Sequence, residues 1–338
     1  MNIKFLGVDL AKRVFQLHGI NAEGEVVLKK RLNQKGLIEF IAKMPTCFIG
    51  MEACSTSHYW ARKFKVLGHE VKLINPAFVK PYVKSNKNDE KDSEAICEAM
   101  TRPSMRFVQI KSIEQQDLQA LHRIREQLIS NRTALANQIR GLLSEYGIVL
   151  PQEIQNVRKL LPTVLDDASN ELTNFSRSLF QELYVDFSYL DNRIKSCDAK
   201  IAALFKSDER CQRIGDIPGV GNITATALIS AIGDLNTFKN GRAFSAWIGL
   251  VPKQASSGQK QILKGISKRG NSYLRKLLIH GARSIVFRTK DKTDQRSLWI
   301  EQLKNRRGMN KAVVAVANKN ARIIWALLAK NERYREAA

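Results

Sequence analysis

Two short apolar runs near the start of the chain each end in a carboxylate, and this feature limits the folds that the chain can adopt. The first run begins at Phe5 and is followed by Asp9, and the second ends at Met51 and is followed by Glu52. Runs of this length are typical of buried strands, and an unpaired charge at the end of such a strand costs desolvation free energy. The pattern predicts a sheet with something cationic near both carboxylates.

A second pair of carboxylates, Asp89 and Asp92, stands three residues apart at the start of a helix-like segment. Side chains at this spacing share one face of a helix. Oxygen ligands suit Mg²⁺ or Mn²⁺, and two such ions about 4 Å apart stabilise the attacking and leaving oxygens of a phosphoryl transfer. Each carboxylate taken alone is also explained as a turn-former or a helix cap. Together with Asp9 and Glu52, the pair predicts a metal site.

The chain carries a large excess of positive charge. Its 338 residues include 55 Lys and Arg against 32 Asp and Glu, which gives a net charge of +23. Such a charge is unusual for a metabolic enzyme and typical of a protein with a polyanionic partner, of which nucleic acid is the leading candidate. The hydrophobic content of 44% is ordinary for globular domains, and the length allows two or three of them.

The sequence contains no signal for export or for a membrane. No run of about 18 apolar residues occurs, and the N-terminal residues pass directly into a strand pattern. The five cysteines have neither the spacing of a zinc site nor that of a disulfide framework. We therefore expect a cytoplasmic protein whose cysteines are reduced packing residues.

Three parts are predicted along the chain. Residues 1–107 alternate strand-like and helix-like runs, which predicts an α/β sheet domain that holds all four carboxylates. Residues 108–207 carry a seven-residue leucine repeat, the pattern of long helices with a coiled-coil seam, and packing within one chain or between subunits explains it equally well. Residues 208–338 form a third, mainly helical part. The expected strands are 3–9, 14–20, 25–32, 46–52 and 70–74, and the expected helices of the first part are 34–43, 57–67 and 89–101.

The third part opens with a glycine-rich turn that leads into a helix-like segment. Gly219 and Gly221 stand in this turn, where exposed backbone N–H groups can grip a phosphate. The segment resembles a helix-hairpin-helix, a module that binds the DNA backbone without reading bases. An ordinary tight turn between helices explains the same residues.

A stretch without any acidic residue follows. Between Lys239 and Lys290 twelve Lys or Arg residues occur and no Asp or Glu. A solvated surface normally mixes both signs, so this stretch is predicted to face a polyanion. The residues expected to bind nucleic acid are Gly219, Gly221, Lys253, Lys260, Lys264, Lys268, Arg269 and Arg275.

Two serines, Ser256 and Ser257, lie in a loop of this acid-free stretch. A hydroxyl attacks a phosphodiester only when one group removes its proton and another stabilises the developing charge. Neighbouring Lys and Arg residues supply the second function, and a metal ion held by the carboxylates helps with both. Ser-Ser-Gly by itself is also an ordinary loop sequence.

These motifs, in this order, resemble the DEDD transposases of bacterial insertion sequences, which are related to the Piv-type DNA invertases. The resemblance covers nearly the whole chain. It is carried by Gly-Val-Asp-x-Ala-Lys, Gly-x-Glu-Ala, Asn-Asp-x-x-Asp-x-x-Ala-Ile, Ile-Pro-Gly-Val-Gly, Gly-Leu-Val-Pro, Ser-Ser-Gly and Lys-Arg-Gly-Asn-x-x-Leu-Arg. It implies a RuvC-like domain of the RNase H type, a helical spacer and a mainly α transposase domain. The implied metal ligands are Asp9, Glu52, Asp89 and Asp92.

The resemblance also implies a nucleophile and partners. The nucleophile falls on Ser257, which lies directly before Gly258 and five residues after Pro252, and forms a phosphoserine link to the cut strand. Members of the family are guided by a structured RNA from the element's own non-coding end. They assemble as tetramers with active sites shared between subunits, so a homo-oligomer, either a dimer or a tetramer, is expected here.

Three other hypotheses explain part of the sequence. Actin-like kinases also begin with a strand that ends in Asp, yet the Gly-rich phosphate loops that they need deeper in the chain are missing. A non-catalytic nucleic-acid scaffold accounts for the charge but not for carboxylates at the ends of apolar strands. A RuvC-like nuclease would use the same carboxylates with water as the nucleophile, and Ser257 would then be a loop residue.

Overall fold

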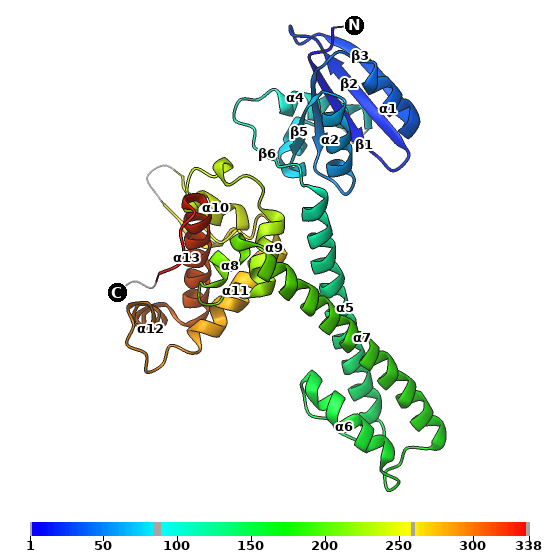
Figure 1. Cartoon of the computed structure of the whole chain (residues 1–338), viewed down its shortest axis with the longest axis vertical. Helices are drawn as coiled ribbons and strands as arrows, with labels where there is room; N and C mark the ends of the chain where they lie inside the picture. The colour runs from blue at the N-terminus through cyan, green and yellow to red at the C-terminus, as the bar shows by residue number, and fades with distance from the viewer. Residues whose placement is uncertain (1, 84–88, 258–260, 336–338) are drawn as a thin grey trace. The chain divides into compact units, whose positions relative to one another are not determined.

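The computed structural model describes residues 2–83, 89–257 and 261–335 (Figure 1). The chain folds into two compact units, Met1–Ser112 and Ile113–Ala338. The boundary between them lies close to the predicted end of the sheet domain. The further division of the second unit at residue 207 stays a prediction.

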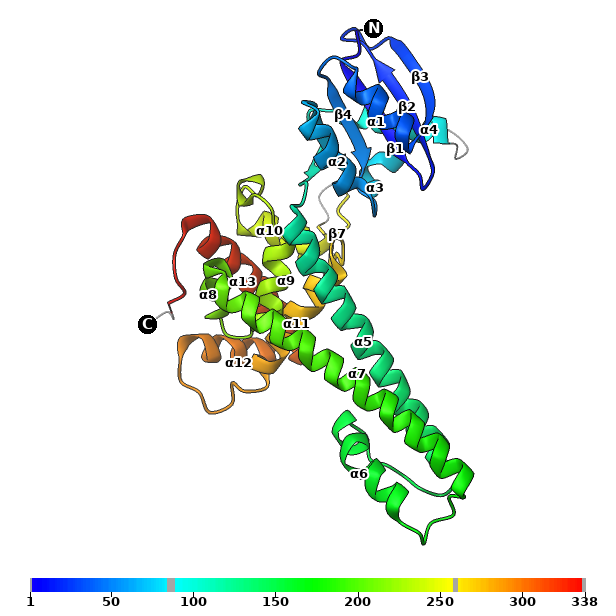
Figure 2. The ribbon, with the colours of Figure 1, turned by 45° about the vertical axis from the view of Figure 1, so that its right-hand side comes forward.

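The first unit is built on a mixed sheet with the strand order β3–β2–β1–β4–β5–β6. In its middle, β1 pairs antiparallel with β2 and parallel with β4 (Figure 2). Parallel pairing continues from β4 to β5, and the short β6 returns antiparallel to β5. The strands are β1 (Phe5–Leu10), β2 (Val14–Ile20), β3 (Val26–Asn33), β4 (Phe48–Glu52), β5 (Glu70–Ile74) and β6 (Phe107–Val108). The helices are α1 (Gln34–Ala42), α2 (Ser57–Val66), α3 (Pro76–Val79), the 3₁₀ turn η1 (Lys80–Tyr82) and α4 (Asp89–Met100).

The central strands bury both faces of the sheet. On one face, Val8 of β1 and Met51 of β4 belong to a core that also contains Phe64 of α2. On the other face, α4 packs so closely that a side chain at Gly7 would place its Cβ atom 2.2 Å from the carbonyl oxygen of Ser93. Apolar side chains on one face and glycine on the other therefore explain why these strands read as short, uninterrupted apolar runs.

The second unit is helical except for one small hairpin. Its helices are α5 (Ile113–Ser144), α6 (Ile154–Asp166), α7 (Asn174–Ser207), α8 (Glu209–Gly215), α9 (Asn222–Ala231), the 3₁₀ turn η2 (Leu235–Thr237), α10 (Gly241–Ile248), α11 (Ser272–Val286), α12 (Gln295–Arg307) and α13 (Met309–Lys330). The hairpin consists of β7 (Pro252–Gln254) and β8 (Leu263–Ile266), which pair antiparallel.

The long helices α5 and α7 pack side by side (Figures 1 and 2). Leu128 of α5 is buried against Ile194 and Cys197 of α7, which agrees with the predicted helix pair. Leu142, the last member of the seven-residue series, is 44% exposed, so the series is not buried along its whole length. A coiled-coil type of packing stays a prediction.

Asp191 of α7 ties the helices of this region together. Its carboxylate accepts hydrogen bonds from Arg132 of α5, at 2.6 Å, and from Arg158 of α6, at 2.8 Å. Burial acts to raise the pKa of Asp191, but the bonds from the two arginines outweigh burial, and the pKa lies below its ordinary value. The charged carboxylate is therefore the form on which this three-helix contact depends.

The core of the second unit is centred on α13, which packs against α10, α11 and α12. By length and composition, α13 is the one helix in the described part of the chain that is apolar enough to cross a membrane. Its side chains Val313, Val316 and Ile324 are nevertheless buried in the core of the unit. The apolar character of α13 is thus accounted for by its place in this core.

Candidate active site and nucleic-acid interface

Asp9 and Glu52 stand at the same level on neighbouring strands. In the parallel pairing of β1 with β4, Val8 is the Cα partner of Met51, and the next residues along the two strands are Asp9 and Glu52. Because neighbouring strands lie about 4.8 Å apart, the backbones of the two carboxylates are close neighbours. Side chains alternate along a strand, so both carboxylates share the sheet face of Gly7, which is the face that α4 covers.

The first turns of α4 lie over this face, and the contacts of Ser93 and Cys97 with β1 show which way the helix is turned. Ser93 abuts Gly7, and consecutive helix residues are rotated by about 100°, so Asp92 and Glu94 lie on opposite flanks of Ser93. The flank of Glu94 also carries Cys97, whose thiol donates a hydrogen bond to the carbonyl oxygen of Phe5, at the beginning of β1. Asp92 lies on the other flank together with Ile96, and this flank meets β4 at Gly50.

The opposite flank of α4 is occupied by an ion pair. Lys29 of β3 lies 2.8 Å from the carboxylate of Glu90, and this contact directs Glu90 toward β2 and β3. His18 of β2 is buried beneath the same flank, and burial lowers its pKa below the ordinary value, although Glu94 acts against that shift. Glu90 thus has a structural partner away from Asp9.

The predicted four-ligand metal site is described only in part. The structure places Asp9 beside Glu52 and leaves Asp92 half-buried on the adjacent flank of α4. Asp89 begins α4, and its side chain lies outside the described residues. Among the residues that the structure describes, no three His, Cys, Asp or Glu side chains gather closely enough to hold a metal ion. The site as a whole stays a prediction.

Both candidate serines lie on the β7–β8 hairpin of the second unit. Ser256 and Ser257 are exposed in the connection between the strands, while Gly258 and Lys260 lie outside the described residues. Lys253 on β7 and Lys264 on β8 are exposed as well. The hairpin therefore presents a hydroxyl and two cations on one small surface element.

The motifs on either side of the hairpin meet as one backbone junction. Gly249 and Gly270 both have positive φ, and a side chain on Gly270 would place its Cβ atom 1.9 Å from the carbonyl oxygen of Trp247. Arg275 donates a hydrogen bond to the carbonyl oxygen of Ile248 at 3.0 Å, so this guanidinium holds the end of α10. These glycines fix the base of the hairpin.

Lys268 and Arg269 stand in the same turn as Gly270 and are exposed. With the guanidinium of Arg275 bonded to the backbone at the end of α10, Lys268 and Arg269 are the freely presented cations of the motif. The nucleic-acid contacts of all three residues stay predictions.

The glycine-rich turn between α8 and α9 packs against α11. Gly219 has a φ of +83°, and a Cβ atom there would lie 2.7 Å from the carbonyl oxygen of Gly281. Gly221 caps α9, with nothing within 4 Å of an added Cβ atom. Gly219 is thus explained by the close approach of two backbones, and a helix-hairpin-helix function stays a prediction.

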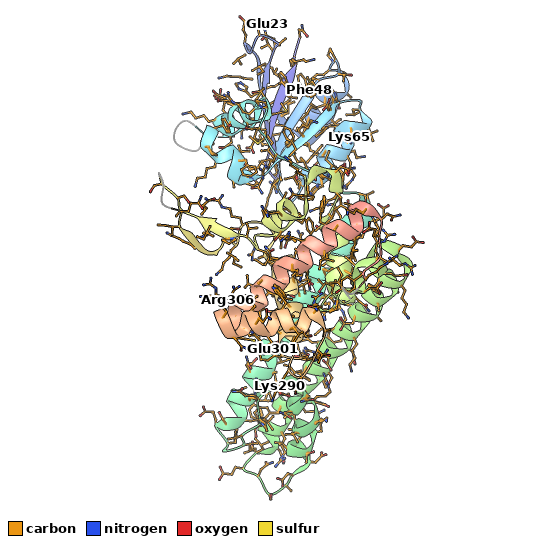
Figure 3. The ribbon with its side chains drawn as sticks, turned by 90° about the vertical axis from the view of Figure 1, so that its left-hand side faces the viewer. Glu23, Phe48, Lys65, Lys290, Glu301 and Arg306 are labelled. Atoms are coloured by element: carbon orange, nitrogen blue, oxygen red, sulfur yellow. The ribbon has the colours of Figure 1, made fainter. Side chains whose placement is uncertain are left out.

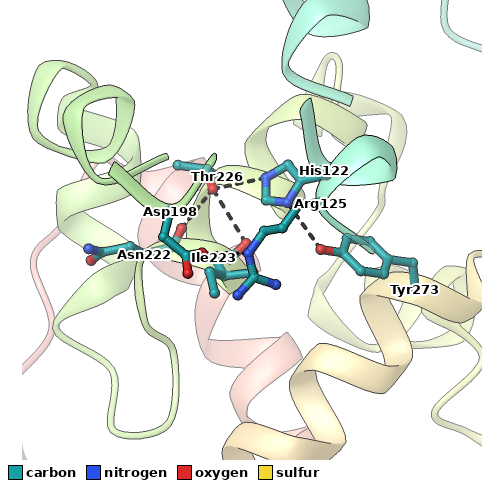
Figure 4. Close-up of polar contacts among 7 residues, drawn as sticks. All are labelled: His122, Arg125, Asp198, Asn222, Ile223, Thr226 and Tyr273. Atoms are coloured by element: carbon teal, nitrogen blue, oxygen red, sulfur yellow. Dashed lines mark hydrogen bonds and ion pairs between the residues drawn. The ribbon is translucent and has the colours of Figure 1, made fainter. Parts of the chain in front are cut away.

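A buried polar cluster that the sequence did not reveal lies between α5, α9 and α11 (Figure 4). His122 Nε2 is 3.0 Å from Thr226 Oγ1, and His122 Nδ1 is 3.1 Å from the Tyr273 hydroxyl. The Thr226 hydroxyl donates to the carbonyl oxygen of Asn222 at 2.7 Å, so Thr226 accepts from Nε2–H, and Nδ1 is left to accept from Tyr273. A neutral imidazole satisfies every partner.

Burial and charge keep this imidazole neutral. Burial, aided by nearby Arg125, lowers the pKa of His122 to about 4, and burial raises the pKa of Tyr273 to about 12. Arg125 itself donates to Asp198 at 2.5 Å, which holds its charge beside the ring. The cluster joins residues that are 104 and 151 positions apart, a separation at which no local sequence pattern operates.

Comparisons with known proteins agree with the fold and with these motifs. A DEDD transposase model of the IS110 type matches residues 6–148, and the model described as the transposase IS116/IS110/IS902 family matches residues 211–297. The transposase for insertion sequence element IS1111A of Coxiella burnetii is 48% identical over 99% of this chain and 92% of its own length. A probable family 20 transposase of Pseudomonas aeruginosa is 47% identical over 99% of both chains. The pilin gene-inverting protein of Moraxella bovis is 25% identical over 85% of this chain and 84% of its own.

The mixed sheet with its strand-end carboxylates, followed by a helical unit with a basic hairpin, defines a DNA transposase of the DEDD class. The chain belongs to the transposase IS116/IS110/IS902 family. The resemblance inferred from the sequence is therefore confirmed. The first unit is accordingly consistent with a RuvC-like DEDD domain.

Proposed function

We propose that this transposase cuts and rejoins DNA strands by attack of Ser257 on a phosphodiester, assisted by Mg²⁺ or Mn²⁺ held by Asp9, Glu52, Asp89 and Asp92. The observation that carries the proposal is the register of β1 and β4, which sets Asp9 beside Glu52 under the first turns of α4. Two carboxylates this close disfavour each other's charged form unless a cation lies between them. An all-oxygen donor set of this kind fits a hard divalent ion.

In this reaction the first unit supplies the metal ligands and the second unit supplies the nucleophile. The Ser257 oxygen forms a bond to phosphorus while the bond from phosphorus to the leaving sugar oxygen breaks, and the leaving oxygen takes up a proton. The divalent ion supplies charge stabilisation on the phosphate oxygens when bound. A sugar hydroxyl then attacks the phosphorus of the phosphoserine, and the bond from phosphorus to the Ser257 oxygen breaks. The proton that the hydroxyl loses is balanced by one that the serine oxygen takes up, so the strands are rejoined and the serine is released.

The cations around the hairpin would hold the DNA backbone on either side of the cut. The exposed cations on either side of the serine in sequence are Lys253, Lys264, Lys268 and Arg269. Lys260 is also predicted to bind nucleic acid and lies outside the described residues. Each phosphate contact of this kind adds affinity that weakens with salt.

A structured guide RNA and a homo-oligomer with shared active sites complete the proposal. The net charge of +23 is compatible with an RNA partner as well as a DNA partner. Because the carboxylates and Ser257 belong to separate compact units, a site composed from two chains is compatible with the fold.

One observation favours a second candidate, a RuvC-like nuclease that uses water. Ser257 belongs to the second compact unit, whereas Asp9 and Glu52 belong to the first, so the carboxylates form a site within one unit that does not include the serine. The carboxylate pair alone suffices for a water nucleophile.

Detection of a protein–DNA adduct separates the two candidates. Purified protein is incubated with Mg²⁺, the transcript of the DNA flanking the coding region and labelled DNA that carries the element junction, and the products are separated on a denaturing gel. We expect an adduct with the wild type and with Ser256→Ala, the matched control, and none with Ser257→Ala. Cleavage by all three proteins without an adduct would show that water is the nucleophile.

A further inference from the structure

We infer that a basic groove along α13 binds an unpaired segment of DNA strand beside the serine hairpin. The groove consists of two cavities of about 1140 and 980 Å³ that share Trp299, Lys319 and Ile323 in their walls. It lies on the second unit, where α12, marked by Glu301 and Arg306 in Figure 3, runs beside α13. We call it the α13 groove.

The first cavity of the α13 groove carries only positive charge. Arg242 of α10 and Lys311, Lys319 and Arg322 of α13 line it, and no Asp or Glu does. All four side chains are exposed, and none forms an ion pair with another residue in the described part of the chain. Four like charges around one cavity repel each other, so the cavity suits an anion with several charges.

The Lys319 ammonium is both partly buried and close to other cations. Burial lowers the pKa of Lys319 below its ordinary value, and the neighbouring charges of Arg296 and Arg322 add to the shift. A phosphate beside the ammonium group would offset this shift, because an opposite charge favours the charged form. This agrees with the unpaired cations in the wall.

An aromatic surface lies among the same cations. The Lys319 ammonium lies over the Trp299 ring, 4.3 Å from its centroid, and Trp299 lines both cavities. Trp325 lines the first cavity, and its buried Nε1 has no hydrogen-bond partner among the described residues. Cations beside an indole are the combination that binds single strands, because an unpaired base stacks on the ring while its phosphates meet the charges. In a duplex the faces of the bases are stacked on one another and do not reach a ring.

The position of the groove beside the serine hairpin indicates that the bound single strand is DNA. Pro252 of β7 and Ile266 of β8 line the first cavity, and the connection between these two strands carries Ser257. A strand that leaves the groove therefore enters the surface where the phosphodiester is cut in the proposed reaction. The choice of DNA rests on that proposed function, whereas the groove and its single-strand chemistry do not.

Binding measurements with the full-length protein, in the absence of divalent ions so that no strand is cut, test the inference. The probes are a labelled single-stranded DNA of about 12 nucleotides, the same sequence as duplex, and the same sequence as RNA. The groove variant is Lys311→Gln/Lys319→Gln/Arg322→Gln. Its charge-matched control, Lys159→Gln/Lys200→Gln/Lys206→Gln, removes three exposed lysines of α6 and α7.

We expect the groove variant to bind single-stranded DNA about tenfold more weakly or worse, with a salt dependence shallower by about two units of slope, and the control to bind like the wild type. Trp299→Phe should remove the quenching of tryptophan fluorescence by the strand and leave the salt slope unchanged. Because the phenyl ring keeps an aromatic face and the packing of the indole, this variant assigns the quenching to Trp299 without loss of the fold.

Equal binding of single-stranded DNA by the groove variant and the control would overturn the inference, as would an equal loss of duplex binding. A loss confined to RNA would overturn the assignment to DNA. The outcome is independent of the adduct test: a wild type that forms no adduct but loses single-strand binding in the groove variant contradicts the serine mechanism and leaves the groove in place.

Discussion

The neutral His122 makes the stability of the second unit depend on pH. Its pKa of about 4 in the folded protein, caused first by burial, lies below the ordinary value of 6.5. Between these values the unfolded chain takes up a proton and the folded chain does not, so the free energy of unfolding decreases as the pH falls from 6.5 toward 4. At about 1.4 kcal/mol per unit of pKa, the decrease between pH 7 and pH 4.5 amounts to roughly 2 kcal/mol.

Urea unfolding of the wild type and of His122→Gln at several pH values measures this contribution. Tryptophan fluorescence reports mainly on the second unit, which contains Trp247, Trp299 and Trp325 but not Trp60. The amide of the variant can bond both former partners of the ring and does not titrate, so the variant should lose about 2 kcal/mol less than the wild type between pH 7 and pH 4.5.

The titration of the carboxylates is common to the wild type and the variant, so it cancels in the comparison between them. The pKa of Asp191 lies below its ordinary value of 3.8, so Asp191 stays charged above pH 4.5. His280→Gln, at an exposed position of α11, controls for the loss of an imidazole as such. Equal losses of unfolding free energy in the wild type and His122→Gln would refute the buried neutral imidazole.

Two further predictions concern the packing of the second unit. Asp191→Asn keeps the shape of the side chain but removes the charge that binds Arg132, and it should lower the free energy of unfolding by roughly 2–4 kcal/mol, with an unchanged urea midpoint as the contrary result. Gly281→Ala places a Cβ atom 1.9 Å from the carbonyl oxygen of Gly219, so it should destabilise the unit by about 3 kcal/mol. The same change at Gly141, which has open space around it in α5, should stabilise the unit by about 0.5–1 kcal/mol, and equal effects at both glycines would contradict the close contact.

The strands of the first unit were predictable from the sequence because the signal is local. The expected strand 25–32 is observed at Val26–Asn33, and the expected strand 46–52 at Phe48–Glu52. The second is an apolar run, and the first opens with the apolar residues Val26, Val27 and Leu28 after the turn at Gly24, so each carries a local strand signal. The nearness of Asp9 to Glu52 needed one more step, because the ends of the two strands meet only when β1 and β4 are adjacent in the sheet, as their parallel register shows.

Contacts between residues far apart in the sequence were not predicted. His122 meets Tyr273 across 151 positions, and neither residue belongs to a periodic pattern that would single it out. Three cations of the α13 groove, Lys311, Lys319 and Arg322, were not predicted because they follow the end of the acid-free stretch at Lys290. Their spacing of eight and three residues nevertheless places them on one face of a helix. That spacing was the available signal.

Cleavage by a single carboxylate variant tests the central claim most directly. Asp9→Asn is compared with the wild type and with Asp117→Asn, which makes the same change at an exposed position of α5, on labelled junction DNA with Mg²⁺ and the flanking transcript. We expect Asp9→Asn to cut about a hundredfold more slowly or not at all and to bind the DNA as tightly as both other proteins, because loss of a metal ligand removes transition-state stabilisation and leaves the phosphate contacts. Cleavage by Asp9→Asn at the wild-type rate would contradict the role of the strand-end carboxylates.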